Sequence, residues 1–162
     1  MIIASPIEIA PARPGDLGRI ITRHVEIYCG EFGYPPVFEH YVIQAFADFV
    51  AAPASGDVVL AARAGAALVG SAALKMRDDG WAQLRFLYAD AAARGQGLGR
   101  RLSEAVLAQA RAAGARNMLL ETASDLGPAR GLYAALGFQL VNEVAVDWLP
   151  AGVVSETWRL AL

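Results

Sequence analysis

The chain has 162 residues, a formal net charge of −2 and a single cysteine, Cys29. Its length predicts a single domain over residues 1–162 that can bury a full core without disulfides or a structural metal. The slightly acidic balance argues against nucleic-acid binding, and no apolar run or signal peptide indicates a membrane, so we expect a cytoplasmic location. Hydrophobic residues make up 56% of the chain, a surplus that a homodimer interface would bury.

The N-terminal part is predicted to hold one strand and two helices. Residues 7–9 alternate apolar and polar side chains, as a half-buried strand does. Apolar residues then recur at helical spacing over 17–28, with Asp16 as the expected N-cap. A segment containing glycine and proline at 30–36 ends this helix, and a second helical face follows over 38–49.

Three strands and a long helix are predicted in the middle of the chain. Apolar runs at 57–63 and 67–76 are joined by a tight turn, and another turn leads into a strand at 81–88. These three form an antiparallel meander. An alanine-rich amphipathic helix is expected from about 97 to 113, ending at Gly114, where a left-handed cap is favourable.

The C-terminal part adds a buried strand, a helix and two more strands. The strand at 116–122 follows a helical crossover, so we expect it to run parallel to the last strand of the meander. Pro128 begins the next helix and Gly137 ends it. The last strands are expected near 138–146 and 153–162, which gives the order β-α-α-β-β-β-α-β-α-β-β.

A glycine-rich segment lies where the meander leads into the alanine-rich helix. It consists of Arg94, Gly95, Gln96, Gly97, Leu98, Gly99 and Arg100. Unobstructed backbone N–H groups at a helix start, together with the helix dipole, favour phosphate binding. Arg101 adds positive charge. The G-x-G-x-x-G spacing and the Gly-Lys-Ser/Thr ending are both absent, which disfavours a dinucleotide-binding oxidoreductase and a Walker-type loop. A flexible surface turn is the alternative.

Two stretches resemble the GNAT N-acetyltransferases. Arg94, Gly97 and Gly99 have the Arg-x-x-Gly-x-Gly spacing of motif A, which binds the pyrophosphate of coenzyme A, and residues 129–138 are similar to the family signature Ala-x-x-Leu-Tyr-x-x-x-Gly-Phe. The resemblance implies an α/β fold of the α+β type, with a mixed, mostly antiparallel sheet of about seven strands flanked by four helices. The N-terminal helices look most like the acetyltransferase halves of bacterial MarR-type regulator fusions, without their DNA-binding domain.

The resemblance also implies a reaction, the transfer of an acetyl group from acetyl-CoA to a primary amine by direct attack in a ternary complex, without a metal. Tyr133 matches the family's general acid, although an aromatic residue packed in the core is the alternative interpretation. The N–H of Ala89 is the expected oxyanion donor. The implied cofactor-binding residues are Leu87, Tyr88 and Ala89, at a strand bulge that pairs with the pantetheine arm, the loop from Arg94 to Arg100, and Ser124.

Two positions depart from the family pattern. Leu126 stands where many members have an asparagine that contacts the cofactor, and Ser124 or Thr122 is expected to supply that hydrogen bond. Gln83 stands where several members have a glutamate that acts as the base, and an amide cannot take up the proton. Four side chains remain candidates for the base, beside a water chain to solvent. They are Glu121, Asp90, Asp125 and His24.

The acceptor is predicted to be a small-molecule or peptide amine bound near the loop at 31–36. Aromatic residues there, with Glu26, Glu31 and Glu39, suit a cationic amine, although a packed core with a solvated helix face is an equally good interpretation. Two other functions remain open at this point. One is a non-catalytic acyl-CoA-binding sensor, and the other is an acyltransferase that uses a longer acyl-CoA.

Overall fold

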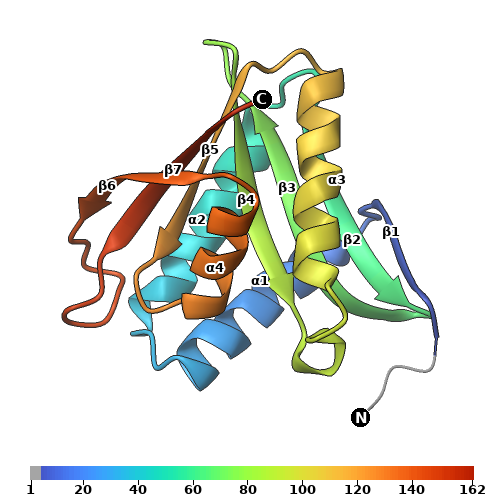
Figure 1. The fold of residues 1–162 in the computed structure, drawn as a ribbon. Helices are drawn as coiled ribbons and strands as arrows, with labels where there is room; N and C mark the ends of the chain where they lie inside the picture. Colours follow the sequence, from blue (N-terminus) through green and yellow to red (C-terminus); the bar gives the residue numbers. More distant parts are fainter. Residues whose placement is uncertain (1–4) are drawn as a thin grey trace.

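Seven strands form one sheet in the order β1-β2-β3-β4-β5-β7-β6, in a computed structural model that describes residues 5–162 (Figure 1). The strands are β1 (Ile7–Pro11), β2 (Val58–Ala64), β3 (Ala67–Met76), β4 (Trp81–Ala89), β5 (Asn117–Ala123), β6 (Gln139–Val144) and β7 (Ser155–Ala161). Every neighbouring pair is antiparallel except β4 and β5, which are parallel. This arrangement confirms the predicted meander and the predicted parallel crossover.

Helices cover both faces of this sheet. They are α1 (Asp16–Val25), the π-helical turn η1 (Glu26–Glu31), α2 (Val37–Ala51), the 3₁₀ turn η2 (Ala91–Ala93), α3 (Leu98–Ala112) and α4 (Gly127–Ala135). Figure 1 shows α1 and α2 on one face of the sheet and α3 and α4 on the other. Within the described part of the chain, no helix is both long enough and apolar enough to cross a bilayer.

Each face of the sheet has its own hydrophobic core. On one face, α3 packs against β3 and β4 through fully buried side chains such as Leu102. This close approach requires Gly70 on β3, because a Cβ there would lie 2.9 Å from the carbonyl oxygen of Tyr88 and 3.0 Å from the side chain of Leu98. On the other face, the side chains of α1 and α2 form a second, largely aromatic cluster with Tyr88 and Phe86.

Both predicted glycine caps are present, at the ends of α3 and α4. Gly114 has φ 84° and Gly137 has φ 95°, in the left-handed region where a side chain is strained. After α4, the Phe138 N–H donates to the Tyr133 carbonyl at 3.0 Å and the Gly137 N–H donates to the Ala134 carbonyl at 3.0 Å. These bonds make a Schellman cap, which fixes the end of the helix that carries Tyr133.

The predicted cap at Asp16 is wrong. Asp16 is the first residue of α1, and the N-cap position belongs to Gly15, whose φ of 91° no branched residue would adopt easily. The buried Asp16 carboxylate instead accepts a 2.6 Å hydrogen bond from the Arg13 N–H and pairs with Arg63 on β2. It therefore anchors the start of α1 to the sheet rather than satisfying the amides of its own helix.

The first helix also extends further than predicted. We expected it to break at residue 30, but it continues as η1 to Glu31, where the Phe32 N–H donates to the Ile27 carbonyl five residues back at 3.3 Å. A π-turn of this kind adds one residue to a helical turn and is frequent at functional sites. Here it brings Tyr28 to the wall of the cavity described below.

The outer strand β6 is exposed along its whole length. Leu140, Val141 and Val144 are apolar side chains at this edge with 40–50% of their surface exposed. Exposed apolar residues on an edge strand are a ready interface for another chain. The homodimer stays a prediction.

Candidate active site

The sheet opens between β4 and β5, where these parallel strands stop pairing. Their register runs from Trp81 opposite Asn117 to Leu84 opposite Leu120, and both strands then continue without pairing to each other. Because β4 remains paired with β3 on its other side, only its β5 side is left without a strand partner. The result is a fork between β4 and β5, in which the β4 arm presents backbone N–H and C=O groups that pair with no strand.

The orientation of these backbone groups follows from the β3 side of the same strand. The Asp90 N–H donates to the Val69 carbonyl at 2.8 Å, so it points toward β3. Successive N–H groups point to opposite edges of a strand. The Ala89 N–H therefore points into the fork, as the predicted oxyanion donor must.

A β-bulge in β4 bends the strand at Phe86. The register with β3 shifts between Ser71, opposite Tyr88, and Ala73, opposite Arg85. Phe86 has φ 53°, and its carbonyl accepts a 2.6 Å hydrogen bond from the Ser71 hydroxyl. Positive φ at a bulky residue costs about 1–3 kcal/mol and needs support from its surroundings.

Aromatic packing supplies that support. The Phe86 ring stacks on Phe46 of α2 with 3.7 Å between centroids, and the Arg85 guanidinium lies 4.9 Å above the Phe86 ring. We predicted the bulge in the segment 87–90; the residues opposite Ala72 are Phe86 and Leu87, so the bulge overlaps the start of that segment. The missing signal was Ser71, whose hydroxyl reaches across from β3.

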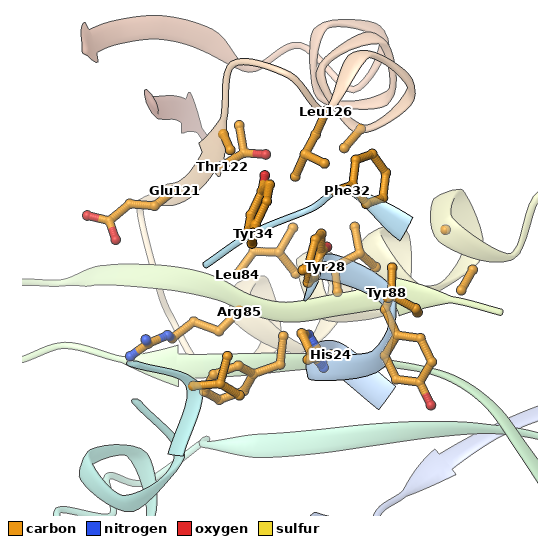
Figure 2. Close-up of a pocket in the computed structure, with 18 of the residues that line it drawn as sticks. His24, Tyr28, Phe32, Tyr34, Leu84, Arg85, Tyr88, Glu121, Thr122 and Leu126 are labelled. Atoms are coloured by element: carbon orange, nitrogen blue, oxygen red, sulfur yellow. The ribbon is translucent and has the colours of Figure 1, made fainter. Parts of the chain in front are cut away.

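A cavity of about 420 Å³ extends from the fork toward α1 and α2 (Figure 2). Six of the predicted site residues line it: Leu87, Tyr88, Ala89, Arg94, Gly99 and Tyr133. The other predicted site residues lie outside this lining: Gly95, Gln96, Gly97, Leu98, Arg100 and Ser124. Most of the glycine loop therefore lies outside the cavity wall, and only Arg94 and Gly99 of that loop line it.

The glycine loop leads directly into α3. Gly97 occupies the N-cap position with φ 68°, and no side chain caps the helix. The first backbone bond of the helix is from the Arg101 N–H to the Gly97 carbonyl at 2.9 Å. The N–H groups of Leu98, Gly99 and Arg100 thus precede any intrahelical bond, an arrangement that, together with the helix dipole, favours an anion.

The arginines around this loop have different partners. The Arg94 side chain pairs with Glu31 of η1 at 3.1 Å, and Arg100 pairs with Glu104 one turn along α3 at 2.9 Å. Both pairs are exposed, so they are weak and can exchange for a phosphate. Arg101 does not add charge to the loop as predicted, because its guanidinium donates to the Ile7 carbonyl of β1 at 2.9 Å.

Tyr133 comes from α4 and lies in the wall of the cavity. Only 6% of its surface is exposed, and its ring lies 6.1 Å from Phe138 and 6.5 Å from Trp158 between centroids. Burial raises the pKa of the Tyr133 phenol above its ordinary value. The phenol therefore keeps its proton at neutral pH.

Ser124 and Thr122 occupy different surroundings, although either one was predicted to replace the family's asparagine contact. The Ser124 hydroxyl accepts a 3.0 Å hydrogen bond from the Val154 N–H, so it holds the segment that leads into β7. Thr122 and Leu126 line the cavity. Of the two residues, only Thr122 lies in the cavity wall.

Aromatic side chains build the other end of the cavity. They come from η1, α2, the loop between these two and the β6–β7 loop: Tyr28, Phe32, Tyr34, Phe38, Tyr41 and Trp148. Burial raises the pKa of Tyr28 to about 12, so its hydroxyl is neutral. His24 is buried beneath this end, its Nδ1 lies 2.9 Å from the Ile20 carbonyl, and burial lowers its pKa to about 4. It is a neutral packing residue at pH 7.

The carboxylates predicted to receive a cationic amine do not line this cavity. Glu26 pairs with Arg23, Glu31 pairs with Arg94, and Glu39 is exposed on α2. They belong to the solvated helix face, which was the alternative interpretation.

Glu121 is instead the only acidic residue in the cavity lining among residues 5–162. Two of the other predicted base candidates are already engaged, since Asp90 pairs with Arg23 at 2.7 Å and Asp125 accepts from Tyr34 at 2.8 Å. Gln83 lies in the wall with Glu121 and Arg85. Sequence reasoning missed Arg85, although the alternation of the strand at 81–88 places it on the same face as Gln83.

Comparisons with known proteins agree with this architecture. The sequence profile of the acetyltransferase (GNAT) family matches residues 21–138, more than half of the chain. No curated protein matches the chain.

Solved structures share the fold along almost the whole chain. A GNAT-family acetyltransferase from Staphylococcus aureus Mu50 is 16% identical with a TM-score of 0.77, and the alignment covers 96% of this chain and 99% of that one. A GCN5-related N-acetyltransferase from Kribbella flavida is 23% identical with a TM-score of 0.75, covering 96% and 98%. YncA from Salmonella typhimurium, solved with its cofactor acetyl-CoA, is 17% identical with a TM-score of 0.69, covering 97% and 94%.

The profile match and the forked sheet with its glycine loop lead to the same assignment: the chain belongs to the GNAT family and is an acetyltransferase that uses acetyl-CoA as its co-substrate.

Proposed function

We propose that the protein transfers the acetyl group of acetyl-CoA to a primary amine, by direct attack while both substrates are bound. One observation carries this proposal: a single cavity joins the fork between β4 and β5 to the aromatic chamber under α1 and α2. An acyl donor entering from the glycine loop and an amine entering from the chamber would therefore meet at the fork.

The donor would be held mainly by backbone groups. The N–H groups of Leu98, Gly99 and Arg100 point out of the start of α3 and would bind the pyrophosphate. Arg94 would exchange Glu31 for a phosphate oxygen. The backbone of Leu87 and Ala89 would pair with the amides of the pantetheine arm, which takes the place of a strand in the fork. Thr122 would supply a side-chain contact.

Acetyl-CoA supplies an activated thioester to this site. The Ala89 N–H would donate to the carbonyl oxygen of that thioester, where negative charge develops during attack. Tyr133 would give its proton to the departing sulfur. Burial makes this phenol a weaker acid than a free tyrosine, but the same dry surroundings also favour a neutral thiol over a thiolate.

The attacking amine must lose a proton, and Gln83 cannot accept it. Glu121 is the acidic residue of the described cavity lining, so we propose that it takes up this proton, directly or through water. It would also attract the ammonium form of the amine to the fork before the proton is lost.

The test is release of free thiol from acetyl-CoA in the presence of a panel of amines. We expect turnover in the wild type and a fall of about 10²- to 10⁴-fold in kcat for Tyr133→Phe, the contribution typical of general acid catalysis. All five tyrosines of the chain line the cavity, so the control is CoA affinity, measured by calorimetry. The variant should keep that affinity, and unchanged kcat would remove Tyr133 from the mechanism.

Two outcomes would favour one of the alternative functions over acetyl transfer. Tight binding of acetyl-CoA without thiol release for any amine would support the acyl-CoA sensor, which the Gln83 and Leu126 departures motivate. Faster thiol release from succinyl-CoA than from acetyl-CoA would support transfer of a longer acyl group.

A further inference from the structure

Two oppositely charged side chains face the aromatic end of the cavity without pairing. Arg85 comes from β4 and Glu121 from β5, and both line the cavity. Among residues 5–162 neither forms an ion pair, whereas Arg94, the other arginine of the lining, is paired with Glu31. Figure 2 shows Arg85 and Glu121 extending toward the same side of the cavity.

The strand register explains why these two residues are neighbours. Leu84 and Leu120 form the last paired position of β4 and β5, so Arg85 and Glu121 are the first residues of the two arms of the fork. Leu84 and Leu120 belong to the core that α3 covers, so alternation turns the residues that follow them, Arg85 and Glu121, toward α1 and α2. Burial raises the pKa of Tyr41, Glu121 raises it further and Arg85 opposes this, so both charges act on one hydroxyl.

The acyl donor does not account for the arginine. Arg85 lies four residues before Ala89 in β4, at most roughly 13 Å of strand, and the amides at the start of α3 lie beyond the Ala89 end of that strand. Its guanidinium is held 4.9 Å above the Phe86 ring at the closed end of the fork. A phosphate bound at the glycine loop would be out of its reach.

The wall beyond the two charges is formed by aromatic rings. Tyr41 and Trp148 stack in parallel with 4.0 Å between centroids, and Phe38 lies 6.2 Å from Trp148. Such a wall favours a flat or bulky apolar group over a hydrated one. The pocket thus offers a cation, an anion and an aromatic surface around one space.

We propose that the acceptor is an α-amino acid with a large apolar or aromatic side chain, whose carboxylate binds Arg85, whose ammonium binds Glu121, and whose side chain packs against Tyr41 and Trp148. This inference rests on the proposed acetyl transfer. In that reaction the α-ammonium gives up one proton to Glu121, an N–C bond forms and the C–S bond breaks. The nitrogen then loses a second proton to solvent and the sulfur receives one from Tyr133, which regains a proton from solvent. The products are an N-acetyl amino acid, CoA and one released proton.

The experiment is a binding measurement that needs no turnover. Protein saturated with CoA, which carries no acetyl group, is titrated calorimetrically with matched pairs: L-phenylalanine against phenethylamine, L-tryptophan against tryptamine, and L-leucine against isoamylamine. At least one amino acid should bind about 10- to 100-fold more tightly than its decarboxylated partner, the range expected when a charged hydrogen-bonding partner is lost.

Arg85→Gln should abolish this preference by weakening the amino acid alone. Arg159→Gln is the matched control, since that guanidinium also lies over an aromatic ring, 5.0 Å from Trp81, but outside the cavity lining. The control should keep the preference, and both variants should keep the wild-type affinity for CoA.

Equal affinities within every pair, or a preference that survives Arg85→Gln, would overturn the amino-acid acceptor while leaving acetyl transfer intact. A preference for the amino acid without thiol release from acetyl-CoA would instead support the binding site and overturn the proposed transfer. The two failures are therefore distinguishable.

Discussion

The Tyr34 hydroxyl donates a 2.8 Å hydrogen bond to the Asp125 carboxylate and so joins the loop before α2 to the loop before α4. These loops are 91 residues apart in sequence. The first belongs to the aromatic end of the cavity and the second leads into the helix of Tyr133. This bond connects the aromatic end of the cavity to the helix that carries Tyr133.

Tyr34→Phe should therefore affect both stability and the acceptor. Burial raises the pKa of Tyr34 and the Asp125 bond raises it further, so the lost bond is one to a charged, partly buried group. We expect the free energy of unfolding in urea to fall by about 1–3 kcal/mol. The KM for the amine should rise while the KM for acetyl-CoA stays the same. Asp125→Asn keeps an oxygen acceptor and should lower the free energy of unfolding by less than Tyr34→Phe does. An equal or larger decrease would show that the effect of Tyr34→Phe does not come from this hydrogen bond.

Gly97→Ala should weaken CoA binding more than it weakens the fold. Gly97 and Gly114 flank α3, both have positive φ, and an added Cβ meets nothing within 4 Å at either. Alanine at each should destabilise the protein by a similar amount, about 1–2 kcal/mol. Only Gly97 precedes the amides proposed to bind the pyrophosphate, so only Gly97→Ala should raise the Kd for CoA, by about 10-fold. Equal Kd values for the two variants would argue against that site.

The free energy of unfolding should depend on pH because His24 is buried without a charge. Its pKa is lowered to about 4 by burial in the folded protein, against 6.5 in an unfolded chain. Between these values the unfolded chain binds a proton that the folded protein does not, so the free energy of unfolding falls as pH decreases from about 6.5 to 4. The loss is on the order of 3 kcal/mol. His24→Phe should remove this part of the slope in urea titrations; identical slopes would contradict the buried neutral histidine.

Ser124→Ala and Thr122→Val separate a structural hydroxyl from a cofactor contact. Ser124→Ala removes the acceptor of the Val154 N–H and should lower the free energy of unfolding by about 1 kcal/mol with the KM for acetyl-CoA unchanged. Thr122→Val keeps the shape of the side chain and should raise that KM instead. The reverse pattern would restore Ser124 to the cofactor site, as first expected from the sequence.

Local features of the chain were predictable because short-range sterics decide them. The caps at Gly114 and Gly137 follow from the tolerance of glycine for positive φ, and the open amides before α3 follow from the glycines in the preceding loop. The resemblance to the GNAT family indicated Tyr133 as a site residue, and in the structure Tyr133 lies in the wall of the cavity.

Only the tertiary structure decided which side chains meet. The fork depends on the bulge at Phe86, which a hydroxyl from β3 and a ring from α2 hold in place. Arg85 and Glu121 become neighbours because the register of β4 and β5 ends one residue earlier. Periodicity along the sequence specifies which face of a strand a residue occupies, but it carries no information about where two distant strands stop pairing.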